Sequence, residues 1–299
     1  MSSEDAYGHR TVTDAAVASF GVLTGDYARM HFDHHWGKAS AIGGSIAHGL
    51  LSACWAVGAM TRHAPERIGV GDPEAVVAGF SVKFGRMVYV GDTLCVQHVT
   101  EGSDTGFEMR TQDDEVATQG RLTLTRGALP PAPEPFEVAP WSPPGSGQTI
   151  YADDLLEQGP RAEGPGRTLT EGEAVRFATE VGETNPLYLN RVFAESARFG
   201  RCVAPPMLTF CLAFSDFLDD LLRMPMPNTG FAGHLGDSWT LHAPVSIGDT
   251  VRGRYCVEDV RPSKSHPERA VVRFGLQVLN QHDAVVQSGA VMMMIGRRA

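Results

Sequence analysis

Residues 25–51 read GDYARMHFDHHWGKASAIGGSIAHGLL, and the chain repeats this layout 157 residues later. Residues 11–93 align with residues 168–250 at that constant offset without a net gap, so that Gly25 falls on Gly182. A repeat of this length indicates one structural unit used twice. Other identical pairs are Thr11/Thr168, Phe20/Phe177, Ala47/Ala204, Cys54/Cys211 and Gly91-Asp92-Thr93/Gly248-Asp249-Thr250.

The two copies differ where polar residues cluster. The N-terminal copy has Asp26 and His31 five residues apart, whereas the C-terminal copy has Glu183 and Tyr188 at the matching positions. Imidazole titrates near neutral pH and can take or give a proton there, while an unperturbed phenol has a pKa near ~10. We therefore predict that one copy has kept an acid/base pair that the other has lost.

The length of 299 residues suits two such units and a connector. We expect an N-terminal unit at residues 1–127, a linker at residues 128–148 and a C-terminal unit at residues 149–299. The segment from Gly127 to Gln148 carries seven prolines, which remove backbone donors and stiffen a chain into extended form. Residues 1–10 are predicted to be a loose polar lead.

The composition indicates an ordinary globular protein, with 42% hydrophobic and 20% charged residues. A net charge of −10 argues against non-specific binding to nucleic acid or to anionic membranes, because both need basic patches. The five cysteines include no CxxC pair, and Cys54 and Cys211 fall in apolar helices, so we expect core thiols in a reducing cytoplasm. Neither a signal peptide nor a membrane-length apolar run is apparent, and we predict a cytoplasmic protein.

Hydrophobic periodicity predicts the same order of elements in both copies. Each has a short helix, an irregular stretch, a long helix that is apolar nearly all round, and then several strands, which is an α+β arrangement of antiparallel strands around a buried helix. The expected helices are Asp14–Leu23, 47–63, 171–181 and one from Pro206; the expected strands lie within 76–99, 107–111, 116–126, 231–242, 250–260, 270–279 and 284–295.

Asp26 and His31 are the first candidates for chemistry. An acid and an imidazole in one loop are by themselves more often a turn cap and a packed histidine, since short motifs match by chance. Here Ala47-His48-Gly49 follows at the start of the buried helix. The combined order is what favours an active site.

This order resembles the hydratase motif of MaoC-like, R-specific enoyl-thioester hydratases and dehydratases. That motif runs Gly-Asp-x-Asn-Pro-x-His-x-Asp and later Ile-Ala-His-Gly; Asp26, His31 and Asp33 match its first part, and Ile46-Ala47-His48-Gly49 its second. GRMVYVGDTL at residues 85–94 is similar to the family's strand, and GETNPLYLN at 182–190 and VAPPMLTF at 203–210 look like the non-catalytic half of its double-hotdog members.

The resemblance implies a double hotdog fold, in which two tandem repeats form a pseudo-dimer with one continuous sheet and the acyl chain lies between them. It implies reversible hydration of a 2-enoyl thioester, or dehydration of a 3-hydroxyacyl thioester. Asp26 and His31 would share the proton transfers, and the backbone N–H of Gly49 would face the thioester oxygen. A helix N-terminus suits that oxygen because it presents unpaired N–H groups and partial positive charge.

The sequence departs from the motif at Ala28 and Arg29, where the family has Asn-Pro. The C-terminal copy keeps Asn185-Pro186 but has Pro205-Pro206 in place of His48-Gly49, and proline lacks an N–H. We therefore expect one active site per chain, in the N-terminal copy, with the C-terminal copy supplying the acyl-binding wall.

Further candidate substrate contacts are Tyr27, Ser45 and His48 in the motif, and Arg261, Lys264 and Arg269 on a hairpin of the C-terminal copy. The three cations suit phosphates of coenzyme A or a phosphopantetheine arm, unless they form a solvated tip. A second basic cluster contains Arg191, Arg198 and Arg201. Trp55, Phe210, Phe214 and Phe217 have helical spacing and are expected in the core, although some could line the acyl tunnel.

We predict neither a metal nor another cofactor. His31, His34 and His35 are close in sequence, but neighbouring residues of an extended segment point apart, and a metal site needs a defined ligand set. We expect one catalytic histidine and two that pack or face water.

Two alternatives remain open at this point. One is an acyl-thioester hydrolase on the same fold, although residues 49–62 of the long helix contain no carboxylate of the kind that such enzymes use. The other is a non-catalytic acyl-thioester binding or biosynthetic scaffold protein, because fold alone does not fix function. The sequence leaves open whether coenzyme A or a carrier protein bears the acyl group, and whether the chain forms a homodimer.

Overall fold

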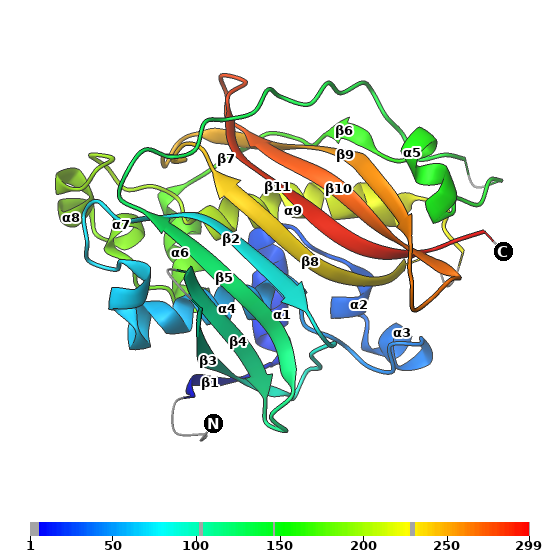
Figure 1. Cartoon of the computed structure of the whole chain (residues 1–299), viewed down its shortest axis with the longest axis horizontal. Coiled ribbons are helices and arrows are strands. Elements are labelled where there is room, and N and C mark those ends of the chain that lie inside the picture. The colour runs from blue at the N-terminus through cyan, green and yellow to red at the C-terminus, as the bar shows by residue number, and fades with distance from the viewer. Residues whose placement is uncertain (1–5, 102–103, 146, 228–230, 299) are drawn as a thin grey trace.

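The computed structural model describes residues 6–101, 104–145, 147–227 and 231–298. In these residues the strands form one 11-stranded sheet in the order β1-β3-β4-β5-β2-β8-β11-β10-β9-β6, with β7 paired to β9 (Figure 1). The neighbouring strands pair antiparallel throughout. The expected α+β double hotdog, with one continuous sheet, is confirmed.

The N-terminal repeat supplies one half of this sheet and its helices. Its elements are β1 (Tyr7–Thr11), α1 (Asp14–Thr24), α2 (Arg29–Phe32), α3 (His34–Ala39), α4 (Gly49–His63), η2 (Pro65–Ile68), β2 (Val76–Phe84), β3 (Thr93–Glu101), β4 (Asp104–Thr111) and β5 (Val116–Thr125).

The C-terminal repeat gives the other half in the same order. Its elements are η3 (Ala152–Asp154), α5 (Leu155–Gln158), β6 (Arg161–Glu163), β7 (Arg167–Thr168), α6 (Glu171–Val181), α7 (Pro186–Leu189), α8 (Arg191–Ser196), α9 (Pro206–Arg223), β8 (Phe231–Leu241), β9 (Thr250–Pro262), β10 (Arg269–Leu279) and β11 (Val285–Gly296).

The two halves join where β2 pairs with β8 at the middle of the sheet. Phe80 lies opposite Trp239 and Val82 lies opposite Asp237 in this pairing. Because the offset between the repeats is 157, exchanging the repeats maps one of these pairs onto the other. The joint is therefore the axis of a pseudo-dimer within one chain.

The long helices α4 and α9 lie on the same face of the sheet (Figure 1). Residues 50–61 of α4 are buried all round, which is why the helix carries hydrophobic and small residues at every position. Cys54 and its counterpart Cys211 are both buried, and their thiols interact across the repeat boundary. Both were predicted to be core residues, and this is confirmed.

Two segments of the N-terminal repeat differ from the sequence expectations. The predicted polar lead is wrong for residues 7–10, because they belong to β1, which pairs with β3 at the edge of the sheet; residues 1–5 lie outside the described part. The irregular stretch before Gly44 contains α2 and α3, which are too short to show a helical period.

The proline-rich segment between β5 and η3 does not stand free of the domains. Figure 1 shows it running along the C-terminal half of the sheet. The side-chain amide of Gln277 on β10 forms two hydrogen bonds to this segment. Its oxygen accepts from the N–H of Phe136, and its nitrogen donates to the carbonyl of Glu134. Arg254 of β9 donates to the Phe136 carbonyl. Side chains of the sheet thus pair the backbone groups that proline-rich chain cannot pair with itself.

Among the described residues, no helix is both long and apolar enough to cross a membrane.

Candidate active site

The turn after α1 places Asp26. The helix ends at Thr24, and the following Gly25 caps it: its φ of 89° lies in the left-handed region and its N–H bonds to the Gly21 carbonyl. The next residue, Asp26, is buried, and its Oδ1 accepts from the N–H of Ala28 at 3.1 Å. This bond holds one carboxylate oxygen and leaves Oδ2 directed towards His31.

His31 lies on α2 with its imidazole buried. Its Nδ1 donates to the carbonyl of Ile46 at 2.9 Å, and since a carbonyl only accepts, Nδ1 must carry a proton. In the neutral ring Nε2 therefore has a free lone pair, and it lies 4.0 Å from Oδ2 of Asp26. Burial lowers the pKa of His31 below its usual value, although the Asp26 carboxylate opposes this shift. The site thus holds a neutral base beside a carboxyl group.

His48 supports both members of the pair from behind. Its ring stacks on that of His31 with centroids 3.8 Å apart, and its Nε2 lies 3.1 Å from the backbone carbonyl of Asp26. Burial, and secondarily His31, lower the pKa of His48 to about 4, so the ring is neutral at pH 7. A neutral ring in this place fixes the geometry of the pair without adding a competing charge.

Gly49 opens α4 directly after His48. In the described part of the chain no side chain caps this end of the helix. Gly49 and Leu50 at this helix start border a cavity of about 310 Å³ that Asp26 and His31 also border. A Cβ on Gly49 would lie 3.1 Å from the ring of Phe84, so glycine allows the cavity wall to pack this closely.

Both repeats form the walls of this cavity. Phe84 and Leu50 come from the N-terminal repeat, whereas Phe214 and Leu218 of α9 and His234 of β8 come from the C-terminal one. The cavity is within the range of small-molecule sites, and its lining is mostly apolar with a few polar groups, as such sites usually are.

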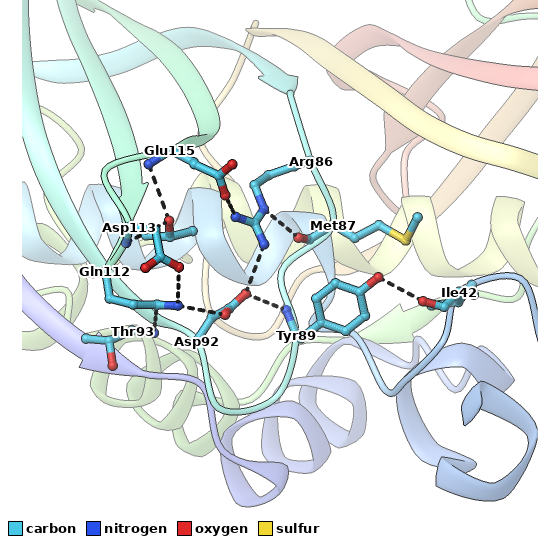
Figure 2. A network of polar contacts seen from close by, with 10 residues as sticks. Ile42, Arg86, Met87, Tyr89, Asp92, Thr93, Gln112, Asp113 and Glu115 are labelled. Atoms are coloured by element: carbon cyan, nitrogen blue, oxygen red, sulfur yellow. Dashed lines mark hydrogen bonds and ion pairs between the residues drawn. The ribbon is translucent and has the colours of Figure 1, made fainter.

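The loop between β2 and β3 forms one edge of the cavity and is tied down by a polar network (Figure 2). Arg86 donates to the carbonyl of Met87 at 3.1 Å and pairs with Asp92 and with Glu115, which directly precedes β5. Asp92 also accepts from the N–H of Tyr89 at 2.9 Å. The hydroxyl of Tyr89 reaches the carbonyl of Ile42, which joins this loop to the segment after α3.

A second cavity of about 690 Å³ begins on the other side of Asp26. It is bordered by Tyr27 and Arg29 from the N-terminal repeat and by Arg167 and Arg223 from the C-terminal one. Tyr27 is 61% exposed and its ring packs against Phe32. Asp26 borders both cavities.

The predicted substrate contacts fall in different places. His48 borders the smaller cavity and Tyr27 the larger one. Ser45 is buried and borders neither, and its hydroxyl has no hydrogen-bond partner among the described residues. Arg261, Lys264 and Arg269 lie at the β9–β10 hairpin and border neither cavity; Arg261 pairs with Asp259 and Arg269 with Glu268. Their contact with a phosphate stays a prediction.

The second basic cluster is mostly engaged in holding the structure. Arg198 donates to the backbone carbonyls of Glu74 and Gly127, and Arg191 pairs with Glu171. The Arg198 bonds join the C-terminal repeat to the N-terminal unit, whereas the Arg191–Glu171 pair lies within the C-terminal repeat.

The equivalent site of the C-terminal repeat is filled. Tyr188, at the position of His31, borders a space of only about 10 Å³ together with Phe199 and Gln287. Gln287 accepts from the hydroxyl of Thr209 and donates to the carbonyl of Pro206, so its amide occupies the start of α9. Pro206, at the position of Gly49, begins that helix without an N–H.

Glu183 of the same repeat is buried, and burial raises its pKa to about 8. Burial also raises the pKa of Tyr188 well above its usual value. Both side chains are therefore neutral near pH 7 and act as packing groups. This supports a single working site per chain.

The missing Asn-Pro leaves the backbone of the motif unchanged. α2 and α3 begin and end at the positions of α7 and α8, at the same offset of 157. Asn185 caps α7 through its side chain, whereas Ala28 has no such group. Instead Asp33 accepts from Arg29 at 2.8 Å and also caps α3 at the N–H of Trp36. Arg29 and Asp33 thus join the ends of α2 in place of the cap.

Ligand atoms of Asp26, His31 and His48 lie within 4.8 Å of one another, a spacing that a metal ion would need. The two imidazoles, however, are stacked with an interplanar angle of 28°. Ring lone pairs lie in the ring plane, so in stacked rings they run side by side and do not converge on one ion. His34 is in a helix, not in an extended segment as expected, and pairs with Asp14 at the surface.

The sequence reading missed His234 and Asp237 of β8. His234 borders the smaller cavity, and its Nε2 lies 2.8 Å from Oδ1 of the buried Asp237. The available signal was the pair of glycines around them, Gly233 and Gly236, because glycine inside a strand often marks a bulge.

Comparison with known proteins agrees with this geometry. Residues 3–120 match the family model of the MaoC like domain, and residues 159–288 match that of the FAS1-like dehydratase domain region. An (R)-specific enoyl-CoA hydratase of Rhodospirillum rubrum is 29% identical over 114 residues, which are 38% of this chain and 74% of that protein.

Solved structures resemble the chain over almost its whole length. A protein of Chloroflexus aurantiacus J-10-fl described as a MaoC domain dehydratase has a TM-score of 0.71 at 18% identity, covering 97% of this chain and 93% of that one. A Mycobacterium tuberculosis protein described as having a double hotdog fold has a TM-score of 0.68 at 16% identity, covering 96% and 93%. The N-terminal repeat is thus similar to the MaoC like domain and the C-terminal repeat to the FAS1-like dehydratase domain region, in a chain whose fold is the double hotdog.

Proposed function

We propose that the protein hydrates a 2-enoyl thioester, and dehydrates the 3-hydroxyacyl thioester in reverse, at the pair formed by Asp26 and His31. The observation that supports this proposal most directly is the position of this buried pair. His31 Nε2 lies 4.0 Å from Asp26 Oδ2, and the pair borders the same cavity as the start of α4, which no side chain of the described residues caps. The match to the MaoC like domain and the hydratase of Rhodospirillum rubrum support the reaction class.

In dehydration, the free lone pair of His31 Nε2 takes the proton from C2 of the 3-hydroxyacyl group. The electron pair of that C–H bond forms the new C2–C3 double bond. The C3–O bond breaks, and the hydroxyl leaves as water with a proton from Asp26. Hydration runs the same steps backwards. Proton transfer by positioned groups of this kind contributes about 10²–10⁴ in rate.

The thioester oxygen gains negative charge while the C2 proton is removed. We assign its stabilisation to the backbone N–H of Gly49 at the start of α4. The partial positive charge of a helix N-terminus favours such an oxyanion, and the apolar walls strengthen the interaction by excluding water. The glycine lets the thioester approach the backbone closely.

We place the acyl chain in the smaller cavity, against Phe84, Phe214 and Leu218, and the arm that bears the thioester in the larger one. Asp26 borders both, so the reacting carbons would lie at the junction. The relative from Rhodospirillum rubrum is named for a coenzyme A substrate, and we propose coenzyme A as the carrier here.

A hydrolase would need a base aimed at the thioester carbonyl. Asp216 of α9 is a candidate for such a base, because burial and the neighbouring Asp220 raise its pKa to about 7. It borders the larger cavity but not the one that holds Gly49 and His31. Hydration therefore has the stronger geometric support.

The two reactions leave different products. Purified protein is mixed with 2-hexenoyl-CoA, and the mixture is analysed by mass spectrometry and by a thiol reagent. We expect a product heavier by one water with no free thiol. Release of free coenzyme A without the hydrated product would establish the hydrolase instead.

A further inference from the structure

A second imidazole–carboxylate pair lies in the wall of the cavity, outside the acid/base pair. Nε2 of His234 lies 2.8 Å from Oδ1 of Asp237, and the two side chains are 16% and 0% exposed. His234 borders the same cavity as His31, but it comes from β8 of the other repeat.

A β-bulge brings these two residues together. In a regular strand residues three apart point to opposite faces. Here β8 shifts register against β11, so that Gly236 lies opposite Met292 and His234 opposite Met293, with Leu235 as the extra residue. The extra residue shifts the alternation by one, and His234 and Asp237 then share the face towards α9.

Both repeats contain this bulge, but the residues of the polar pair are found in the C-terminal repeat and not at the matching positions of the N-terminal one. The N-terminal repeat has the same irregularity in β2, between Val77 and Gly79. At the offset of 157, the counterpart of His234 is Val77 and that of Asp237 is Phe80. Apolar residues thus suffice at these positions, and the polar pair stands in β8, where His234 borders the open cavity and its counterpart Val77 in β2 does not.

The surroundings of the pair are apolar. The ring of His234 lies between Phe84, with centroids 4.6 Å apart, and Phe214, at 5.0 Å and stacked at 19°. Oδ2 of Asp237 is buried without a hydrogen-bond partner among the described residues, and burial raises the pKa of this carboxyl while His234 opposes the rise. Replacing a buried charged pair by apolar residues is often neutral or stabilising, so stability does not explain its presence.

We propose that His234, held by Asp237, recognises an oxygen function on the acyl chain of the substrate, beyond C3. Asp237 occupies Nε2, which leaves Nδ1 for a ligand. Nδ1 donates when the ring carries both protons and accepts when the ring is neutral, so a hydroxyl suits either state and a carboxylate or carbonyl suits the first. The substrate class is thus an oxygenated 2-enoyl thioester rather than a plain alkyl one. The proposal rests on the proposed function, since it places the acyl chain in this cavity.

The size of the cavity fits this reading. At about 30 Å³ for each water-sized group, a cavity of about 310 Å³ holds roughly ten such groups. A six-carbon acyl group with one terminal oxygen function falls within that size. The acid/base pair and His234 border the same cavity, from different repeats.

The test compares kcat/KM for 2-hexenoyl-CoA with that for its tail-hydroxylated derivative and for 2-hexenedioyl-CoA. A hydrogen bond to a charged or polar partner contributes about 1–3 kcal/mol, so the wild-type protein should prefer at least one oxygenated substrate by about tenfold or more. His234→Leu should lose that preference. Leu218→Ala, which changes an apolar part of the same wall, should shift all three substrates in the same direction.

Two results would overturn the inference: a wild-type protein that prefers the alkyl substrate, or a His234→Leu variant that changes all substrates alike. The wild-type comparison needs no variant, and His234→Gln replaces His234→Leu if the latter does not fold. If no substrate is hydrated, the proposed function fails, and calorimetric binding of hexanoyl-CoA and 6-hydroxyhexanoyl-CoA decides the inference separately. Tighter binding of the hydroxylated ligand to the wild type alone supports it, and equal binding contradicts it.

Discussion

His31 and Tyr188 occupy the same position in the two repeats, but His31 borders a cavity of about 310 Å³ and Tyr188 a space of about 10 Å³. The surrounding backbone is the same, because the short helices on either side match at the offset of 157. The difference between the open site and the filled one therefore comes from side chains. Larger groups such as Phe199 and Gln287 fill the C-terminal space.

The helix start can be tested by copying one repeat into the other. Gly49→Pro removes the N–H that we assign to the thioester oxygen, and proline is well tolerated at the first position of a helix, as Pro206 shows. We expect kcat to fall about 10²–10³-fold with little loss of stability.

The matched control is Gly49→Ala, which keeps the N–H and adds a Cβ beside the ring of Phe84. It should reduce kcat/KM less than the proline variant does. Equal losses in the two variants would show that steric crowding, and not the N–H, accounts for the effect.

The raised pKa of Glu183 allows a prediction of how the free energy of unfolding depends on pH. Its pKa is raised in the folded protein to about 8, so between its unfolded value and pH 8 the folded state holds a proton that the unfolded chain has released. This stabilisation is fully present at acid pH and is lost as the pH rises towards and beyond 8. Glu183→Gln stays neutral, so it should be more stable than the wild type at pH 9, on the order of a few kcal/mol.

The measurement is the urea midpoint of both proteins at pH 5 and pH 9, together with hydratase activity. At pH 5 the two should be close, and activity should be unaffected because Glu183 lies in the filled repeat. A loss of activity in Glu183→Gln would contradict the assignment of a single site per chain.

His31 predicts the pH dependence of dehydration. The base form of the ring is needed to take the C2 proton, and burial lowers the pKa of His31 below its ordinary 6.5. The acidic limb of kcat/KM for a 3-hydroxyacyl-CoA should therefore have its midpoint below pH 6.5. A midpoint above that value would mean that Asp26 raises the pKa more than burial lowers it, or that another group is the base.

The architecture could be predicted from the sequence because the repeat can be seen by aligning the chain with itself, and because α4 and α9 are apolar nearly all round. The edge strand β1 was missed, since its residues show no period and are fixed only by pairing with β3. The short helices α2 and α3 were missed for a similar reason: four to six residues are too few for a hydrophobic stripe.

The residues of the candidate site also form two groups: those that could be identified from the sequence and those that could not. Asp26, His31 and Gly49 are close in sequence and matched a known motif, so they could be named in advance. His234 and Asp237 could not, because their proximity depends on a bulge and their place in the cavity depends on how the two repeats pack. Arg261, Lys264 and Arg269 were chosen by charge alone, and charge does not say which surface a hairpin faces.

The central claim is that the pair of Asp26 and His31 performs the hydration. The most direct test follows the loss of enone absorbance when 2-enoyl-CoA thioesters are mixed with the wild type, Asp26→Asn and His31→Ala. We predict turnover by the wild type and a loss of about 10²–10⁴-fold in each variant, with unchanged melting profiles as the folding control. Unchanged turnover in His31→Ala would contradict the account.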